Sequence, residues 1–290
     1  MRETLRHRAA ACFALLIVLS FACPSKISAS PTERAGFTFA VFGDNQPERT
    51  NLGQPEIFKR ILADIDAANP DFVISLGDTI CGSSDPDQMQ AMYQDYSDTI
   101  SSHLKAKLYQ AVGNHDIYGS KANQRFFKSK LGDLYYSFDF QGSHFIVLDS
   151  EVVGEEGRIT GEQLKWLKAD LYKARAARHK FVFAHRPLFP VDGHFGSSLD
   201  VNVAERDALH KLFTASGVTG VFAGHEHLFN NEARNGIRYF ITGGAGGRLF
   251  PSFFGTGDFH HYISVYVNGD KISYTLVKFD SKGTTRQDIP

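Results

Sequence analysis

Residues 37–46 read FTFAVFGDNQ, an apolar, β-prone run that ends in small and polar residues. A strand that ends in metal-type residues is expected for a site built at the carboxyl ends of strands. Five such segments in order are hard to explain as packing. The other four are Gly77-Asp78, Gly113-Asn114-His115-Asp116, His185 and Gly224-His225-Glu226-His227, most of them preceded by a similar apolar run.

The residue types in these segments indicate a site that cleaves phosphoesters with two divalent ions. Such cleavage needs a strong nucleophile and a sink for developing negative charge, and two ions about 3.5–4 Å apart supply both. Carboxylates, amide oxygens and neutral imidazoles suit Mn, Fe and Zn, whereas a thiolate-rich site would favour other metals. One carboxylate must bridge the ions, and a separate acid should protonate the leaving oxygen.

The segments resemble the motifs of the calcineurin-like metallophosphoesterase superfamily, which includes purple acid phosphatases and cyclic-nucleotide phosphodiesterases. The motifs extend from Asp44 to His227, and the flanking strands extend the likeness over nearly all of the chain after residue 22. Gly-Asn-His-Asp followed by Gly-His-x-His is a specific signal. The resemblance implies an α/β fold, a four-layer αββα sandwich with two mixed β-sheets. Alternating strands and helices followed by hairpins favour the same architecture.

The resemblance also implies a role for each matching residue. Asp78 would bridge two divalent ions, either Mn, Fe or Zn, and a hydroxide shared by the ions would attack phosphorus. His115 would be the general acid, and Asp116 would orient it. The first metal would be held by Asp44, Gln46, Asp78 and His227, and the second by Asp78, Asn114, His185 and His225.

Two positions depart from the family pattern, both on the side of the first metal. Gln46 stands where most members have His, and its amide oxygen would ligate a hard ion more weakly than imidazole. Cys81 stands where many members have Asp and purple acid phosphatases have Tyr. Its thiol could be a ligand, a small buried filler or a site of oxidation. We therefore predict a lower affinity for the first metal, or a preference shifted toward Mn or Mg.

Several other residues are weaker candidates for contact with substrate. His194 lies nine residues after His185, a spacing similar to that of a phosphate-facing His in purple acid phosphatases, although a surface position is about as well supported. Arg186 and Arg248 could bind a phosphate oxygen or be solvated. An aromatic cluster could line the leaving group or pack beneath a loop; it comprises Phe250, Phe253, Phe254 and Phe259.

The N-terminal segment predicts export to the periplasm or the medium. Residues 1–22 combine basic residues, the apolar run Ala9–Phe21 and a small-residue cleavage signal, which together are typical of a secretory signal peptide. The apolar run is too short to span a bilayer comfortably. Cys23 follows directly, so a lipoprotein acylated at this residue is the alternative.

The composition is that of one large globular domain, with 290 residues, 42% hydrophobic and 22% charged. A net charge of −1 does not suggest a nucleic-acid surface. The motifs and the family resemblance imply a small-molecule phosphoester as the partner. Of three cysteines, two lie in or beside the predicted signal, which excludes a disulfide framework. We expect a linker at 23–36, a catalytic domain at 37–280 and a C-terminal tail at 281–290.

Apolar periodicity and turn residues predict the secondary structure. Thr160 is expected to cap its helix, with Gln163 at the capping-box position. Helices are expected at Pro55–Ala68, Asp87–His103, Asn123–Leu131, Thr160–Arg175 and Val203–Ala215. Besides the first run, strands are expected at Phe72–Leu76, Leu108–Val112, Leu134–Phe140, Ser143–Asp149, Phe181–Ala184, Val218–Ala223, Arg238–Thr242, Tyr262–Val267 and Lys271–Lys278.

Three functions are compatible with these patterns. The first is an exported phosphomonoesterase with two metals, favoured by the spacing of His185 and His194. The second is a nucleotide or cyclic-nucleotide phosphodiesterase, because nothing in the sequence specifies the leaving-group pocket. The third is a non-catalytic scaffold, which Gln46 and Cys81 motivate. The presence of His115 argues against a scaffold, because a binding module needs no general acid.

Overall fold

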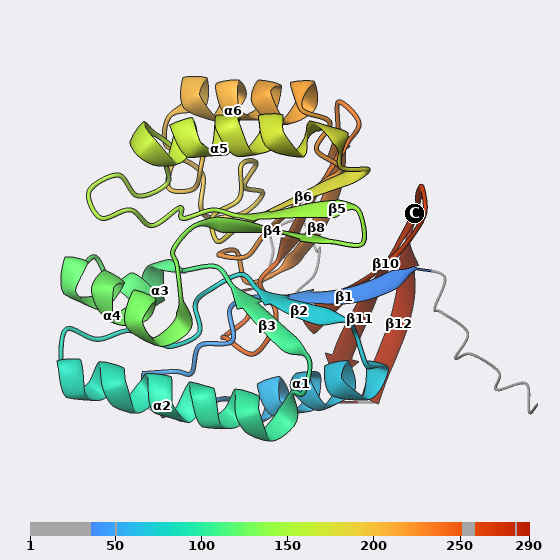
Figure 1. The fold of residues 1–290 in the computed structure, drawn as a ribbon. Coiled ribbons are helices and arrows are strands. Elements are labelled where there is room, and N and C mark those ends of the chain that lie inside the picture. Colours follow the sequence, from blue (N-terminus) through green and yellow to red (C-terminus); the bar gives the residue numbers. More distant parts are fainter. Residues whose placement is uncertain (1–35, 50, 251–258, 282) are drawn as a thin grey trace, which may run out of the picture. The chain divides into compact units, whose positions relative to one another are not determined.

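The computed structural model describes residues 36–49, 51–250, 259–281 and 283–290 (Figure 1). The predicted signal peptide, Cys23 and all but the last residue of the predicted linker lie outside the described residues, as do Phe253 and Phe254. Within the described part of the chain, no helix combines the length and apolar character needed to cross a membrane.

The first sheet has six strands, and its centre is formed by segments far apart in the sequence. β1, β2 and β3 run parallel, and β10 joins β1 in antiparallel fashion. The spatial order is β12 (Gly283–Ile289), β11 (Lys271–Asp280), β10 (His260–Asn268), β1 (Phe37–Phe42), β2 (Phe72–Ser75) and β3 (Lys107–Gln110).

The second sheet also has six strands, and the middle four, β5, β6, β7 and β9, are parallel. Antiparallel strands β4 and β8 close its two edges. The spatial order is β4 (Tyr136–Phe140), β5 (Ser143–Val147), β6 (His179–Ala184), β7 (Gly220–Ala223), β9 (Ile237–Thr242) and β8 (Phe229–Arg234).

Helices cover the outer face of each sheet, as Figure 1 shows. α1 (Glu56–Ala68) and α2 (Pro86–His103) lie against the first sheet, and α5 (Gly161–Lys173) and α6 (Val203–Ala215) lie over the second. The remaining helical segments are α3 (Asn114–Ile117), α4 (Lys121–Leu131) and a short 3₁₀ turn, η1 (Ala174–Ala176). The predicted four-layer αββα sandwich with two mixed sheets is therefore confirmed.

Phenylalanine rings fill the space between the two sheets. Phe39 of β1 lies with its ring centroid 5.3 Å from that of Phe72, 5.4 Å from Phe145 and 5.3 Å from Phe181. Strands buried on both faces have few polar residues, which explains why β1, β2 and β6 are mostly apolar. This aromatic layer joins the two sheets.

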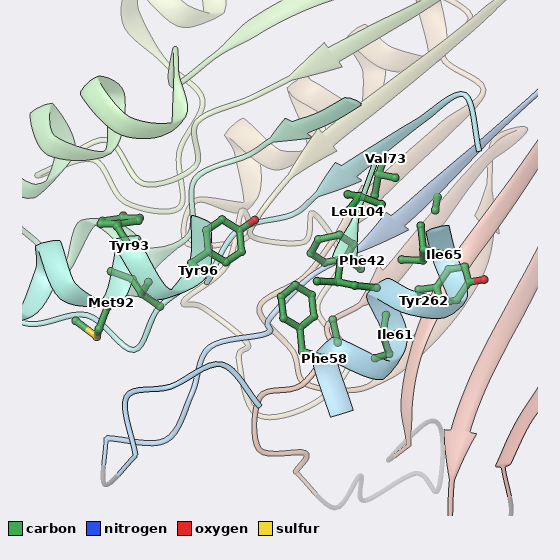
Figure 2. Close-up of a cluster of buried hydrophobic side chains, with 14 of the residues drawn as sticks. Phe42, Phe58, Ile61, Ile65, Val73, Met92, Tyr93, Tyr96, Leu104 and Tyr262 are labelled. Carbon is green, nitrogen blue, oxygen red and sulfur yellow. The ribbon is translucent and has the colours of Figure 1, made fainter. Parts of the chain in front are cut away.

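A second core lies between the first sheet and its helices (Figure 2). Phe58 and Ile65 of α1 point toward Phe42 of β1, and Tyr96 of α2 packs with its ring stacked 6.4 Å from that of Phe58. The apolar residues of α1 recur at helical spacing, so one face of the helix is buried. A third core holds α5 and α6 on the other sheet.

The predicted C-terminal tail is wrong, because Gly283–Ile289 forms the edge strand β12. It pairs with β11 from Asp280↔Gly283 to Tyr274↔Ile289. Only the last residue of β12 is buried, so the strand is held mainly by backbone pairing and carries no apolar alternation. The edge strand β8 was not predicted for the same reason, since its sequence FNNEAR is polar.

Helix starts differ from the predictions where side chains find other partners. Thr160 occupies the N-cap position of α5, but its hydroxyl donates to Glu155 and accepts no capping bond from the described helix. Gln163 bonds instead to the backbone N–H and carbonyl of Asp149. α4 begins two residues earlier than predicted, because the Ser120 hydroxyl accepts from the first turn.

Candidate metal centre

The candidate site lies where parallel strands of both sheets end. Asp44, Asp78 and Asn114 follow β1, β2 and β3 of the first sheet. His185 and His225 follow β6 and β7 of the second sheet. The carboxyl ends of neighbouring parallel strands meet at one edge of a sheet, so these loops converge. Asp44, Asp78 and His185 each offer a ligand atom, and these atoms lie within 4.8 Å of one another.

Three of the site residues adopt left-handed backbone conformations. Their φ angles are 62° for Asp44, 54° for Asp78 and 69° for His225. Each such residue costs on the order of 1–3 kcal/mol, so the surrounding structure must hold it in place. The His225 N–H donates to both carboxylate oxygens of Asp44, at 2.9 and 3.0 Å, and the His115 N–H donates to Asp78 at 2.8 Å.

Glycines let the backbone approach these carboxylates. A Cβ on Gly113 would lie 2.2 Å from the Asp78 nitrogen, and a Cβ on Gly224 would lie 2.2 Å from Asp44 Oδ2. Both distances are far shorter than a nonbonded contact, so any side chain would push the loops apart. Gly113 and Gly224 are therefore required by the close approach of the backbone to these carboxylates.

His185 lies at the centre of the predicted second-metal group. Its Nδ1–H donates to the Leu76 carbonyl at 3.0 Å, because a carbonyl can only accept. The Nε2 lone pair then faces Asn114 Oδ1 at 2.9 Å, Asp78 Oδ1 at 3.5 Å and His225 Nδ1 at 3.2 Å. Burial lowers the pKa of His185 and of His225 well below the usual value, so both imidazoles are neutral.

His227 and Gln46 form the predicted first-metal group with the two carboxylates. The His227 Nδ1–H donates to the Arg248 carbonyl at 2.6 Å, which turns Nε2 toward Asp44 Oδ1 at 3.5 Å. Gln46 Nε2 lies 3.1 Å from His227 Nε2 and 3.3 Å from Asp78 Oδ2. Gln46 Oε1 is buried without a hydrogen-bond partner among the described residues.

The donor set fits cations. Burial, followed by the proximity of Asp78, raises the pKa of Asp44 well above its usual value, and burial raises the pKa of Asp78 to about 7. Two buried carboxylates that resist ionisation beside neutral imidazoles form a site lacking positive charge. Rotation of the Gln46 amide by 180° would bring its orphaned Oε1 toward His227 and Asp78, which completes a set of oxygen and nitrogen ligands.

His115 lies at the rim of this cluster. Its Nδ1–H donates to the Cys81 carbonyl at 2.9 Å, and its Nε2 lies 3.9 Å from Asp78 Oδ2. The side chain is 32% exposed, so Nε2 can reach a bound substrate. Cys81 itself is buried, with its Sγ 3.4 Å from Met92 Sδ in the core. Of the three alternatives for Cys81, the structure therefore supports the buried filler.

Asp116 does not orient His115 as predicted. Its carboxylate is fully buried and accepts from the N–H groups of Gly113 and Asp78, both at 2.9 Å. It also accepts from the N–H of Thr79 at 3.0 Å and the Thr79 hydroxyl at 2.7 Å. The described contacts of Asp116 do not include the His115 ring. Asp116 thus ties together the loops that present Asp78 and Asn114.

The three weaker candidates lie around the cluster in different settings. Both oxygens of Glu151 accept from Arg186, at 2.8 Å each, and Arg186 Nη1 lies 3.4 Å from His225 Nε2. The ring of His194 has its centroid 4.5 Å from that of His225. Arg248 is exposed, and its described link to the site is the carbonyl that accepts from His227.

Two buried carboxylates near the site carried no prediction. Glu151 fixes the Arg186 guanidinium, and Glu226 accepts from backbone N–H groups of the loop before His194. Glu226 could have been noticed, because it lies between the two His of the Gly-His-x-His motif. Of the described members of the aromatic cluster, Phe250 packs 5.1 Å from the His227 ring, and Phe259 packs against His261.

Comparison with known proteins agrees with this geometry. A family profile described as calcineurin-like phosphoesterase matches residues 37–229. The chain is 30% identical over 182 residues to bovine serine/threonine-protein phosphatase CPPED1, covering 59% of this chain and 56% of the relative. It is 28% identical over 243 residues to purple acid phosphatase 21 of Arabidopsis thaliana, covering 75% and 52%. The chain thus spans about half the length of these curated relatives.

Solved structures share the fold. Purple acid phosphatase PPD1 from yellow lupin (Lupinus luteus) superposes with a TM-score of 0.67 at 15% identity, covering 89% of this chain and 54% of that one. A dimetal phosphatase from Danio rerio gives a TM-score of 0.64 at 14% identity, covering 88% and 99%. With the profile match over most of the two-sheet domain, the chain belongs to the calcineurin-like phosphoesterase family, a family of metal-dependent phosphoester hydrolases.

Proposed function

We propose that this protein is an exported phosphomonoesterase that works with two divalent metal ions. The observation that carries the proposal is the pair of acceptor clusters that share Asp78. Its Oδ1 faces His185, and its Oδ2 faces Gln46. The export part of the proposal rests on the N-terminal sequence alone. The named phosphatases among the relatives support a monoester substrate.

The ligand residues divide between the two clusters. When bound, the ions supply a nucleophilic water and positive charge against the developing negative charge of the phosphoryl oxygens. The chain's own part is to hold the ligand atoms in place without further reorganisation. The first ion would be held by Asp44, Gln46, Asp78 and His227, and the second by Asp78, Asn114, His185 and His225.

His115 is suited to protonate the leaving oxygen. The Cys81 carbonyl orients the ring through Nδ1–H, so the proton to be transferred is carried on Nε2. Asp78 Oδ2 lies 3.9 Å from Nε2, so this nitrogen is directed toward the predicted metal cluster. His194 would contact the phosphoryl group of the substrate from the side of the second metal, and its place 4.5 Å from the His225 ring supports this role.

The full chain, stripped by chelator, is expected to hydrolyse p-nitrophenyl phosphate only after Mn, Fe or Zn is returned. An Asp78→Asn variant should remain inactive with each metal, because the carboxylate common to both clusters is lost. Faster turnover of bis(p-nitrophenyl) phosphate would assign a phosphodiesterase. Metal content near zero in the purified protein, with no hydrolysis after any addition, would contradict the proposal and favour a non-catalytic scaffold.

The Gln46→His substitution is expected to tighten binding of the first metal about tenfold, equivalent to ~1.4 kcal/mol. Imidazole is the stronger ligand for Zn and Fe, whereas the amide oxygen favours harder ions. Metal titration followed by elemental analysis measures the change, and Gln94→His on the exposed face of α2 is the control. Equal affinity and equal metal preference in native and variant protein would remove Gln46 from the ligand set.

A further inference from the structure

Glu226 lies between the two site histidines of its motif, yet its carboxylate serves another segment. It accepts from the Val191 N–H, at 3.2 Å to Oε1 and 2.9 Å to Oε2, and from the Asp192 N–H at 3.0 Å. The Glu226 residue is 1% exposed. The two oxygens of one buried side chain thus hold two consecutive backbone N–H groups, which ties the segment to Glu226.

The tethered segment is the turn that carries His194. The His194 Nδ1 lies 3.2 Å from the Asp192 carbonyl and 3.8 Å from Glu226 Oε1. The His194 ring lies against the ring of His225, with centroids 4.5 Å apart. The turn is therefore joined to the same short segment that presents His225 and His227, and a shift of this segment would move His194 with it.

The Glu226 backbone is itself held by hydrogen bonds, so the side chain that tethers the turn starts from a fixed position. Its N–H donates to the Gly224 carbonyl at 2.8 Å, and its carbonyl accepts from the Leu228 N–H at 2.7 Å. A Cβ on Gly243, the residue after β9, would lie 2.3 Å from that carbonyl, so the chain at this point leaves the Glu226 segment little room to move. The neighbouring turn is half-exposed and has no strand or helix of its own.

We propose that Glu226 is a positioning residue that holds the Val191–His194 turn so that His194 contacts the phosphoryl group of the substrate. The proposal rests on the phosphomonoesterase function proposed above. It assigns Glu226 no contact with substrate or metal. Its effect on hydrolysis therefore passes entirely through His194, which distinguishes it from a ligand or a general acid.

A double-mutant cycle tests this dependence. Glu226→Ala and His194→Ala should each lower kcat/KM for p-nitrophenyl phosphate about tenfold, and the double variant should be no worse than either one, because both remove the same contact. The loss should appear largely in KM, with metal content unchanged. Glu162→Ala, an exposed carboxylate on α5, is the control. Effects that multiply in the double variant would overturn the proposal.

Two measurements do not depend on turnover. In chelator-treated protein, Glu226→Ala should speed amide hydrogen exchange across residues 191–194, and Glu226→Gln, which keeps one acceptor oxygen, should speed it less. In Mn-loaded protein, calorimetry should show weaker binding of inorganic phosphate to Glu226→Ala and His194→Ala alike. Unchanged exchange in both Glu226 variants would overturn the tether. If no variant hydrolyses phosphoesters, the proposed function fails, while the exchange result still decides the tether.

Discussion

Replacement of His115 by alanine is expected to lower turnover by about 10²–10⁴-fold, the usual contribution of a general acid. The structure places its Nε2 at the accessible rim of the metal cluster, 3.9 Å from Asp78, with Nδ1–H fixed by the Cys81 carbonyl. Since this ring is outside the predicted ligand set, the metal content should remain that of the native protein. Steady-state kinetics and elemental analysis on the same samples measure the two effects.

The nature of the leaving group sharpens this test. An alkyl phosphate releases a strongly basic alkoxide that needs a proton, whereas p-nitrophenolate leaves readily without one. The loss in His115→Ala should therefore be much larger for the alkyl ester. His103→Ala, at the end of α2, is the control. An equal loss for both esters would assign His115 to stabilisation of the phosphoryl group and would exclude proton transfer as its main role.

Replacement of Asp116 by alanine is expected to destabilise the fold by about 3 kcal/mol or more. The substitution removes the acceptor of four hydrogen bonds, and each buried donor left unpaired costs about 1–3 kcal/mol. The donors belong to Gly113, Asp78 and Thr79, so the loops on the first sheet lose their common anchor. Denaturant unfolding of the metal-free protein measures the stability, and metal titration should show weaker binding.

The conservative variant and a surface variant complete that experiment. Asp116→Asn keeps one acceptor oxygen but turns an NH₂ group toward two of the donors, so it should also be destabilising. Asp98→Ala, on the exposed face of α2, should leave stability unchanged within about 0.5 kcal/mol. If Asp116→Ala lowered activity while leaving stability and metal binding intact, the predicted role of orienting His115 would be restored.

The strands that carry the site could be predicted because their burial is reflected in runs of apolar residues in the sequence. β1, β2 and β6 are covered on both faces, and their sequences FTFAVF, FVIS and HKFVFA are mostly apolar. The edge strands β8 and β12 contain no such apolar run. Their side chains are mostly polar and partly exposed, and pairing is made by backbone groups that every residue possesses. Apolar patterning therefore predicts the centre of each sheet better than its edges.

In the site, too, the side-chain types could be predicted from the sequence, whereas the backbone contacts could not. The predicted ligand residues are Asp, Asn, Gln and His, and the structure brings them together. The orientation of three site histidines, His185, His115 and His227, depends on the carbonyl groups of Leu76, Cys81 and Arg248, which no residue type reveals. Asp116 was misassigned because adjacency in sequence suggested contact with His115. In α3, however, consecutive side chains point in different directions, so Asp116 turns inward while His115 faces the rim.

The left-handed conformations of Asp44, Asp78 and His225 cost stability, although the proposed function requires these side chains. Glycine at each position would relieve the steric strain, because glycine adopts positive φ without steric cost. A laboratory selection for heat resistance alone would therefore favour glycine at three residues to which we assign metal binding. Directed evolution of a more robust catalyst should hold these three codons constant and seek its gains in the surface helices and edge strands.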